Sequence, residues 1–538
     1  MAHPAQRRWY PIAFAVALLV LLPLSVLLFS WHEVDRQIWA HLWQTQLMRL
    51  IGNTLMLVLG VGIGVTLLGV SLAWLTSLCE FPGRRWLDWA LMLPFAIPAY
   101  VLAFVFVGLL DFAGPVQSLM REWFGADLRL PRVRSTGGVI TVLILVFYPY
   151  VYLLARNAFL AQGKGLMEAA RVLGLSPWSA FWRVALPMAR PAIGAGLALA
   201  IMETLADFGA VSVFNFDTFT TAIYKTWYSF YSLTSATQLA SLLLLAVMLV
   251  LYGERRARGA VRPVSERPRG KALYQLKGAQ ALAASVWCGL VFACAFVIPV
   301  LQLLVWFWQR GRFDLDERYT GLILHTLYLG GIAASVTVGV ALLLAFARRM
   351  APTRLMRTTV GLANLGYALP GSMLAVAIML AFSYLDRQLV IPLSDWLGGA
   401  GKPLLLGSLS ALLLAYLIRF MAVAYGPLEN SLARIRPSLP EASRSLGVGG
   451  VGLFFRVYLP LLVPGALSAA LLVFVDVLKE MPATLLMRPF GWDTLSVRVF
   501  EMTSEGEWAR AALPALTLVL VGLLPVIGLI RRSARRIG

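Results

Sequence analysis

Long runs of apolar residues recur along the whole chain and alternate with shorter polar segments that are rich in arginine. A helix needs about 20 apolar residues to cross the roughly 30 Å of hydrocarbon in a bilayer. Runs of that length lie at residues 11–29, 51–76, 88–110, 137–155, 191–213, 236–252, 279–307, 321–347, 359–383, 403–424, 463–486 and 511–530. Because backbone polar groups inside lipid must be satisfied within the protein, the pattern predicts an all-α polytopic membrane protein with about twelve transmembrane helices.

One phrase in the polar segments occurs twice, 273 positions apart. The copies are Glu168-Ala169-Ala170, Gly174 and Val184-Ala185-Leu186-Pro187, and then Glu441-Ala442-Ser443, Gly447 and Val457-Tyr458-Leu459-Pro460. Two shorter matches extend the repeat into the spans: Asn53-Thr54 with His325-Thr326, and Ala96-Ile97-Pro98 with Ala368-Leu369-Pro370. We therefore predict an N-terminal half at 1–252, a basic cytoplasmic linker at 253–277 and a C-terminal half at 278–538. Six spans in each half make the repeats parallel, so their interface is a place for a pathway.

Composition and charge agree with lipid as the main solvent of the chain. Hydrophobic residues make up 59% of the 538 residues and charged residues 13%, and the formal net charge is +20. Basic loops resist translocation, and most of the 46 lysines and arginines fall in loops on the side of the N-terminus. Both termini are therefore predicted to be cytoplasmic. These basic loops also account for the net charge, so nucleic-acid binding is not needed to explain it.

Residue types that support catalysis or cofactor binding do not form recognisable motifs. The three cysteines and four histidines are too scattered for a zinc site or a disulfide framework. No segment has the spacing of a phosphate-binding loop, since Gly163-Lys164 is followed by Gly165 and Gly401-Lys402 by Pro403. We therefore expect no enzyme activity and no bound cofactor in this chain.

Prolines and glycines inside the spans predict local features of the helices. Pro98 and Pro370 break the backbone hydrogen-bond ladder and are tolerable only where neighbouring helices or a wet cavity satisfy the freed carbonyl groups. Such kinked helices commonly line pathways. Gly60 and Gly64 have the four-residue spacing that allows two helices to approach closely.

Each copy of the repeated phrase is expected to form a short helix, a glycine stop and a second short helix. Gly174 can end the first helix, and Ser176-Pro177 provides an N-cap and first residue for the next. In the second copy, Ser438 and Glu441 have the spacing of a capping box. Helix capping is thus one role for Glu168 and Glu441, and contact with a partner is a second role compatible with it.

Two pairs of carboxylates lie in matching spans. Glu203 and Asp207 share one helical face of the fifth span, and Asp476 and Glu480 repeat that spacing in the eleventh. A carboxylate deep in a membrane costs about 2.5–3.5 kcal/mol on insertion scales, so such groups usually face a cavity or a partner. One interpretation is structural, with Lys479 or nearby arginines neutralising the acids. The other is a translocation pathway, in which carboxylate oxygens favour a hard cation and repel phosphate, sulfate or molybdate.

The repeated phrase resembles the cytoplasmic EAA signature of ABC-importer permeases, in which a short helix docks in a groove of the ATPase subunit. The departures are small: Ser443 replaces the third alanine, and Val184 and Val457 stand where isoleucine is typical. The resemblance implies ATPase coupling through two sets of residues: Glu168, Ala169, Ala170 and Gly174, and Glu441, Ala442, Ser443 and Gly447. It further implies two cytoplasmic ATPase subunits, with ATP bound on those partners and not on this chain.

The segments around the acids, 204–211, 219–224 and 478–486, are similar to those of the fused permeases of bacterial ferric-iron importers. This resemblance covers both halves and implies a type I importer permease fold in the inner membrane, fed by a periplasmic iron-binding protein. It also implies transient ferric-ion contacts at Glu203, Asp207, Asp476 and Glu480. Two alternatives stay open: a permease for thiamine or another small solute, and an ion-coupled secondary transporter. Co-purification with an ATPase would separate an ABC permease, for iron or for another solute, from an ion-coupled secondary transporter.

Overall fold

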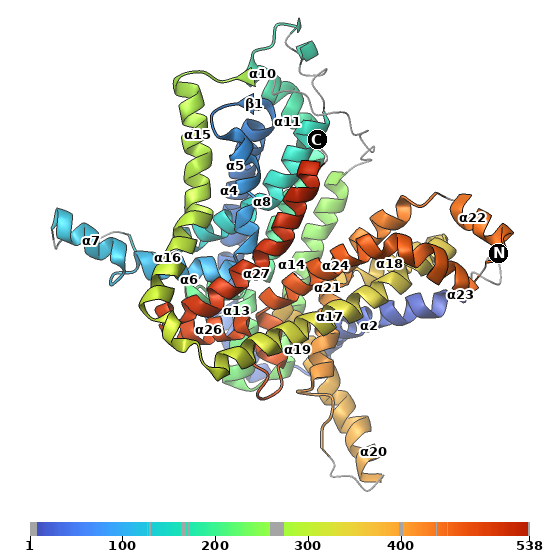
Figure 1. The fold of residues 1–538 in the computed structure, drawn as a ribbon. Helices are drawn as coiled ribbons and strands as arrows, with labels where there is room; N and C mark the ends of the chain where they lie inside the picture. The colour runs from blue at the N-terminus through green and yellow to red at the C-terminus, as the bar shows by residue number, and fades with distance from the viewer. Residues whose placement is uncertain are drawn as a thin grey trace. The chain divides into compact units, whose positions relative to one another are not determined.

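The computed structural model describes residues 8–125, 127, 131–162, 168–170, 172–258, 274–396, 402–436, 438–448 and 450–535. Helices dominate this part of the chain (Figure 1). Twelve helical segments within it are long and apolar enough to cross a membrane, which confirms the predicted all-α architecture and number of spans. They are Tyr10–His32, Leu47–Leu78, Ala99–Phe124, Thr136–Ala161, Pro177–Ala206, Leu233–Gly253, Ala279–Gln309, Glu317–Met350, Gly371–Trp396, Leu409–Ala433, Phe454–Lys479 and Trp508–Gly528.

The chain forms two compact units, each built from both sequence halves. The first unit comprises Met1–Trp39, Ile223–Ser241 and Asp316–Val497. Its elements are α2 (Tyr10–Phe29), η1 (Ser30–His32), α17 (Glu317–Met350), α18 (Arg354–Ala363), η6 (Leu365–Ala368), α19 (Gly371–Leu385), η7 (Asp386–Val390), α20 (Ile391–Trp396), α21 (Leu409–Ala433), α22 (Ser438–Ser445), α23 (Gly450–Leu453), η8 (Phe454–Tyr458), α24 (Leu459–Lys479) and α25 (Pro482–Met487).

The second unit comprises Ala40–Ala222, Leu242–Leu315 and Arg498–Gly538. Its elements are α4 (Leu47–Leu78), β1 (Cys79–Glu80), α5 (Arg84–Ala90), η2 (Leu93–Ala96), α6 (Ala99–Leu110), α7 (Pro115–Phe124), α8 (Thr136–Ala161), α10 (Pro177–Ala180), η3 (Phe181–Ala185), α11 (Leu186–Ala206), α12 (Gly209–Val213), β2 (Tyr274–Gln275), α15 (Ala279–Phe292), η4 (Ala293–Val297), α16 (Ile298–Gln309), η5 (Gly311–Asp314) and α27 (Trp508–Arg535). Within the described residues, four helices have residues in both units: α3 (Arg36–Thr45), α13 (Phe219–Phe230), α14 (Leu233–Arg258) and α26 (Leu495–Ser504).

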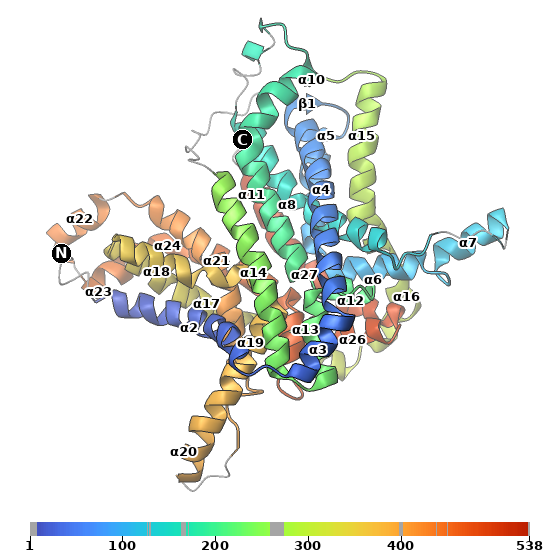
Figure 2. The ribbon, with the colours of Figure 1, turned by 180° about the vertical axis from the view of Figure 1, so that it is seen from behind.

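The first hydrophobic helix of each sequence half packs in the unit formed mainly by the other half. In the first unit, α2 lies beside α17 and α18 (Figure 2). The Tyr10 hydroxyl is 2.6 Å from the Thr353 hydroxyl. In the second unit, α16 packs on α6 and α27, with the Trp306 ring stacked on Phe104 at 6.1 Å between centroids. The packing units and the predicted sequence halves are therefore different divisions of the chain.

The end of the predicted linker packs within the second unit. Residues 259–273 of the linker lie outside the described residues. Strand β2 follows them and pairs in parallel with β1, with Cys79 opposite Tyr274. The ring of Tyr274 lies 5.9 Å from that of Trp74 on α4. Backbone pairing and aromatic packing thus hold the end of the linker at the end of α4.

Close packing of α4 on α8 depends on glycines. A Cβ atom at Gly60 would lie 2.7 Å from Ile140, and one at Gly64 would lie 2.1 Å from Ile144. At Gly69 the nearest atoms include the backbone nitrogen of Tyr152, 2.9 Å away. These distances confirm the interpretation of Gly60 and Gly64 as packing residues.

Two predicted spans are interrupted, because their prolines start new helices. The prediction of one continuous helix at 88–110 and at 359–383 is wrong. The helical turn η2 ends before Pro98, and η6 ends before Pro370. Both prolines adopt extended backbone, with ψ 146° at Pro98 and 140° at Pro370, and α6 and α19 begin immediately after them. A proline has no N–H to continue the ladder, so the break falls where its fixed φ suits a helix start.

Side-chain and backbone donors satisfy the carbonyl groups around these breaks. The Tyr148 hydroxyl donates to the Leu91 carbonyl over 2.9 Å in the second unit. In the first unit, Nη1 of Arg419 donates to the Leu369 carbonyl over 3.1 Å. The carbonyls four residues before the prolines, those of Pro94 and Gly366, accept from the N–H groups of Ile97 and Leu369. The condition placed on prolines inside spans is therefore met within the protein.

Candidate functional site

The first copy of the repeated phrase ends its short helix at a left-handed glycine. Gly174 has φ +80°, and the Leu175 N–H donates to the Ala170 carbonyl over 3.0 Å. This bond across a glycine is the one that closes a Schellman motif. The Ser176 side chain then accepts from the Ser179 N–H over 3.2 Å and caps α10, whose first residue is a proline. The predicted glycine stop and serine cap are both confirmed.

The second copy repeats the same helix end. Gly447 has φ +79°, and the Val448 N–H donates to the Ser443 carbonyl over 3.0 Å. The predicted capping box is wrong in position, because Ser438 is already the first residue of α22 and not the residue before it. The Leu439 N–H, one residue into this helix, donates to the Arg436 carbonyl over 3.2 Å.

A π-helical turn joins each phrase to the membrane helix that follows. These turns are η3 and η8, and each is followed by a leucine and a proline that open α11 and α24. A proline cannot donate to the residue four positions back, and the wider turn accommodates it. Aromatic contacts hold both turns: Phe181 lies 4.8 Å from Trp74 of α4, and Phe454 lies 4.9 Å from Phe346 of α17. Each phrase is therefore fixed to the start of a membrane helix.

The exposed side chains of the two phrases include the expected residues and some that the sequence reading missed. Glu168, Ala169, Glu441 and Ala442 are exposed, and Ser443 is half-buried. Ala170 is buried, so its small side chain serves internal packing and not an outer surface.

Large apolar side chains also stand out at matched positions. Leu173 is 79% exposed and Leu446 is 83% exposed, while Trp182 and Phe455 are 52% and 58% exposed. The signal was present in the sequence, because these apolar residues recur at the spacing of the repeat within polar segments. They add a hydrophobic component to each surface.

The acidic pair of the second unit lies where α11 ends. The helix stops at Ala206, earlier than the predicted end at 213, and Asp207 has extended backbone with ψ 129°. Its carboxylate accepts from the Val211 N–H over 3.0 Å and so caps the short helix α12. The Thr220 hydroxyl donates to the Asp207 carbonyl over 2.6 Å. Glu203 is half-buried one turn earlier on α11.

The acidic pair of the first unit has the matching position at the end of α24. Glu480 follows the last helical residue, and Oε1 accepts from the Ala483 N–H of α25 over 3.0 Å. Its Oε2 lies 3.0 Å from Nε of Arg419, and the two side chains are only 4% and 14% exposed. Asp476 is half-buried one turn earlier. Arg419 is thus one of the arginines that the structural interpretation required.

The four predicted acids divide equally between the two units, with Glu203 and Asp207 in the second and Asp476 and Glu480 in the first. Among the described residues, no group of three or more His, Cys, Asp and Glu side chains could hold a metal ion. Glu203 and Asp476 have interactions of their own within the described part of the chain. The structure therefore places the carboxylates in pairs at helix ends, with one pair in each unit.

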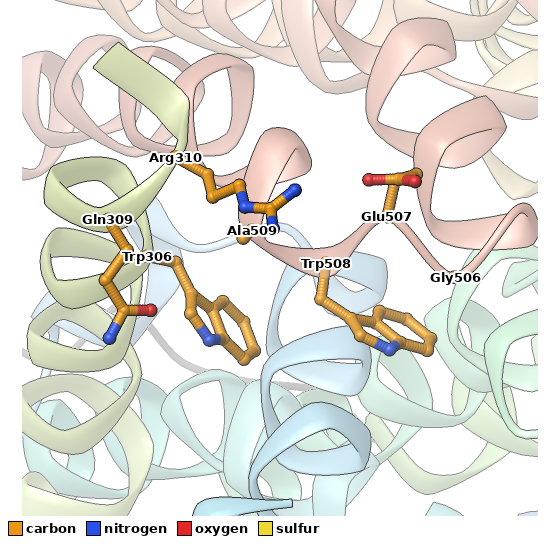
Figure 3. A pocket seen from close by; sticks show the side chains of 7 residues that line it. All are labelled: Trp306, Gln309, Arg310, Gly506, Glu507, Trp508 and Ala509. Atoms are coloured by element: carbon orange, nitrogen blue, oxygen red, sulfur yellow. The ribbon is translucent and has the colours of Figure 1, made fainter. Parts of the chain in front are cut away.

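A separate cavity of about 480 Å³ lies in the second unit, where α16 ends and α27 begins. Figure 3 shows the indole rings of Trp306 and Trp508 pointing the same way, with the Arg310 guanidinium and the Glu507 carboxylate away from them. None of the residues predicted from the sequence lines this cavity.

Comparison with known proteins places the chain in a family. Residues 65–253 match the model of the binding-protein-dependent transport system inner membrane component. The Fe(3+)-transport system permease protein FbpB 2 of Haemophilus influenzae is 27% identical over 493 residues, 90% of each chain. The ferric transport system permease protein FbpB of Actinobacillus pleuropneumoniae is 24% identical, over 89% of this chain and 70% of its own. The sulfate transport system permease protein CysT of Escherichia coli is 30% identical, over 36% of this chain and 69% of its own.

The chain belongs to the family of binding-protein-dependent transport system inner membrane components. Its twelve candidate spans agree with a multi-pass protein of the inner membrane. The predicted class, a transport permease and not an enzyme, agrees with this family and with the ferric relatives that match both halves.

Proposed function

We propose that this chain is the permease of an ATP-driven importer that passes ferric iron from a periplasmic binding protein to the cytoplasm by alternating access. The observation that carries the proposal is the extent of the match to a ferric permease, which covers 90% of both chains and therefore both halves of the repeat. The sulfate relative matches only 36% of this chain. The carboxylate pairs add a chemical argument, since they favour a hard cation over an oxyanion.

The proposed partners on the cytoplasmic side are two ATPase subunits, one for each repeated phrase, which bind and hydrolyse the ATP. The proposed contact residues are Glu168, Ala169 and Gly174 in one copy and Glu441, Ala442, Ser443 and Gly447 in the other. Ala170 leaves the predicted set, because its side chain is buried. Support comes from the matched glycine-ended helices and the exposed leucines beside them. Because each phrase continues through a π turn into α11 or α24, movement of an ATPase would pass to a membrane helix.

The proposed contacts for the cation are drawn from Glu203, Asp207, Asp476 and Glu480. All four lie at the ends of α11 and α24 that are distant from the repeated phrases. A movement that begins at the phrase would therefore displace the acids at the other end of the same helix. In this proposal both termini are cytoplasmic, as the distribution of basic loops predicts.

The test is uptake into proteoliposomes that contain the permease and its ATPase, supplied with ATP inside and with the loaded binding protein outside. We expect ferric uptake that depends on ATP and on the binding protein, and no uptake of sulfate or thiamine. Uptake of thiamine or sulfate in place of iron would replace the proposed substrate. Uptake driven by an ion gradient without ATPase would overturn the importer class itself.

A further inference from the structure

The ion pair between Arg419 and Glu480 joins two interruptions of the helical backbone. Arg419 contacts Oε2 of Glu480 through Nε at 3.0 Å and the Leu369 carbonyl through Nη1 at 3.1 Å. Leu369 directly precedes the break that starts α19, and Glu480 forms the break after α24. One guanidinium thus binds a group at each break.

The remaining groups at this place leave no room for a further ligand on Glu480. Its Oε1 accepts from the Ala483 N–H, and its side chain is 4% exposed. A Cβ atom at Gly371 would lie 2.3 Å from Oε1 of Glu480 and 2.9 Å from Nη1 of Arg419. The start of α19 therefore packs directly on the ion pair. A solute cation could reach the Glu480 carboxylate only by displacing Arg419.

The N-terminal half lacks this arrangement. The repeat aligns Tyr152 with Tyr425, and that register places Val146 where the C-terminal half has Arg419. Val146 is a buried apolar residue. In the described part of the chain, Asp207 has a backbone partner in Val211 and no ion pair with an arginine or lysine. The two matched acids therefore have different electrostatic surroundings.

We propose that Arg419 is a positioning residue for transport: it neutralises Glu480 and holds the two helix breaks together, so that the cation meets only the remaining acidic contacts, Glu203, Asp207 and Asp476. This inference rests on the proposed function and narrows it, because Glu480 leaves the set of cargo contacts. The physical reason is that a buried charge is stable only with its partner, and removal of one partner leaves the other uncompensated.

The experiment is a double-mutant cycle of Arg419→Gln and Glu480→Gln in the permease–ATPase complex. Each single variant leaves one buried charge, and we expect a loss of thermal stability and at least about tenfold lower ferric uptake per complex. The double variant removes both charges and keeps an amide at each position, so uptake should return to within about threefold of the parent. The matched control is Arg49→Gln, at an exposed pair with Asp217, which should change uptake by less than about twofold.

A second readout separates positioning from a loss of folded protein. The number of ATP molecules hydrolysed for each ferric ion transported does not depend on the amount of complex. We expect this ratio to rise in the assembled Arg419→Gln complex, because the fastening between the breaks is lost, and to fall again in the double variant. A ratio unchanged in Arg419→Gln would overturn the positioning role.

Two further outcomes would also overturn the inference. A double variant as stable as the parent but still about tenfold impaired would make Glu480 a direct contact of the cation. A double variant as unstable as the single variants would mean that the two charges do not compensate each other. Thermal unfolding needs no substrate, so the stability part of the cycle can be read even if the parent transports a solute other than iron. Failure of the proposed function, ferric transport, can thus be distinguished from failure of the proposed role of Arg419.

Discussion

The N–H of Leu175 donates to the carbonyl of Ala170 over 3.0 Å across Gly174, and the chain repeats this bond between Val448 and Ser443 across Gly447. A Cβ atom at either glycine would find no other atom within 4 Å. Space is therefore available for a side chain at both positions, and the requirement for glycine is the left-handed backbone alone. This distinction determines which substitutions should be tolerated.

We expect valine at Gly174 and Gly447 together to abolish ATPase docking and uptake while the protein still inserts in the membrane. A β-branched residue in left-handed backbone costs of order 1–3 kcal/mol, enough to unwind a helix end on a short exposed segment. Co-purification of the ATPase with the permease measures the effect. Asparagine tolerates this backbone, so Gly174→Asn with Gly447→Asn is the matched control and should retain most docking. Normal uptake by the valine variant would contradict the coupling role.

Replacing Leu173 and Leu446 with serine should weaken ATPase binding without changing the thermal stability of the permease. Both side chains are highly exposed, so little packing is lost in the free protein, whereas each burial in an interface contributes about 1.5–3 kcal/mol. The apparent dissociation constant of the ATPase should rise at least about tenfold. Leu404→Ser is the control, since Leu404 is 66% exposed on a loop remote in sequence from both phrases. If Leu404→Ser weakened ATPase binding equally, the exposed leucines of the two phrases would not form a specific ATPase-binding surface.

Gly371→Ala should destabilise the permease by about 1–3 kcal/mol, because the added methyl group would meet the Glu480 carboxylate and the Arg419 guanidinium. The measurement is thermal unfolding of the purified permease. Gly361→Ala is the matched control in the same unit: Gly361 lies within α18, and nothing lies within 4 Å of its Cβ position. Alanine favours helix over glycine, so the control should be neutral or more stable. Equal stability of the two variants would contradict the close approach of the Glu480 and Arg419 side chains to Gly371.

Asp207→Asn should lower ferric uptake at least about tenfold while the complex with the ATPase still assembles. Asparagine keeps an oxygen that can accept from the Val211 N–H, so the cap on α12 is retained and only the charge is lost. Asp207→Ala removes both, and we expect it to lower thermal stability as well, by about 1 kcal/mol. Uptake equal to the parent in the asparagine variant would leave Asp207 with a capping role alone.

Several local features could be predicted from the sequence because the residues involved act on their immediate neighbours. Gly174 and Gly447 end helices through their own backbone, and Ser176 caps the helix that starts one residue later. The twelve spans follow from the length of apolar runs, which lipid imposes directly. Pro98 and Pro370 predicted a disturbance of the helix at each position. A proline does not by itself show whether the helix is kinked or divided into two separate helices. Tyr148 and Arg419, which donate to carbonyls near these breaks, lie 57 and 50 residues away from them along the chain.

By itself, the sequence determined that this protein is a duplicated, twelve-span permease with two matched polar phrases, because hydrophobic length, glycine stops and repeats can be read along the chain. The tertiary structure alone decided that α2 packs with α17 and α18, and that Arg419 compensates Glu480. Apolar helices are nearly interchangeable by composition, so their neighbours depend on shape and not on pattern. The electrostatics of a buried acid depend on distance in space, and two acids with the same sequence spacing therefore acquired different partners.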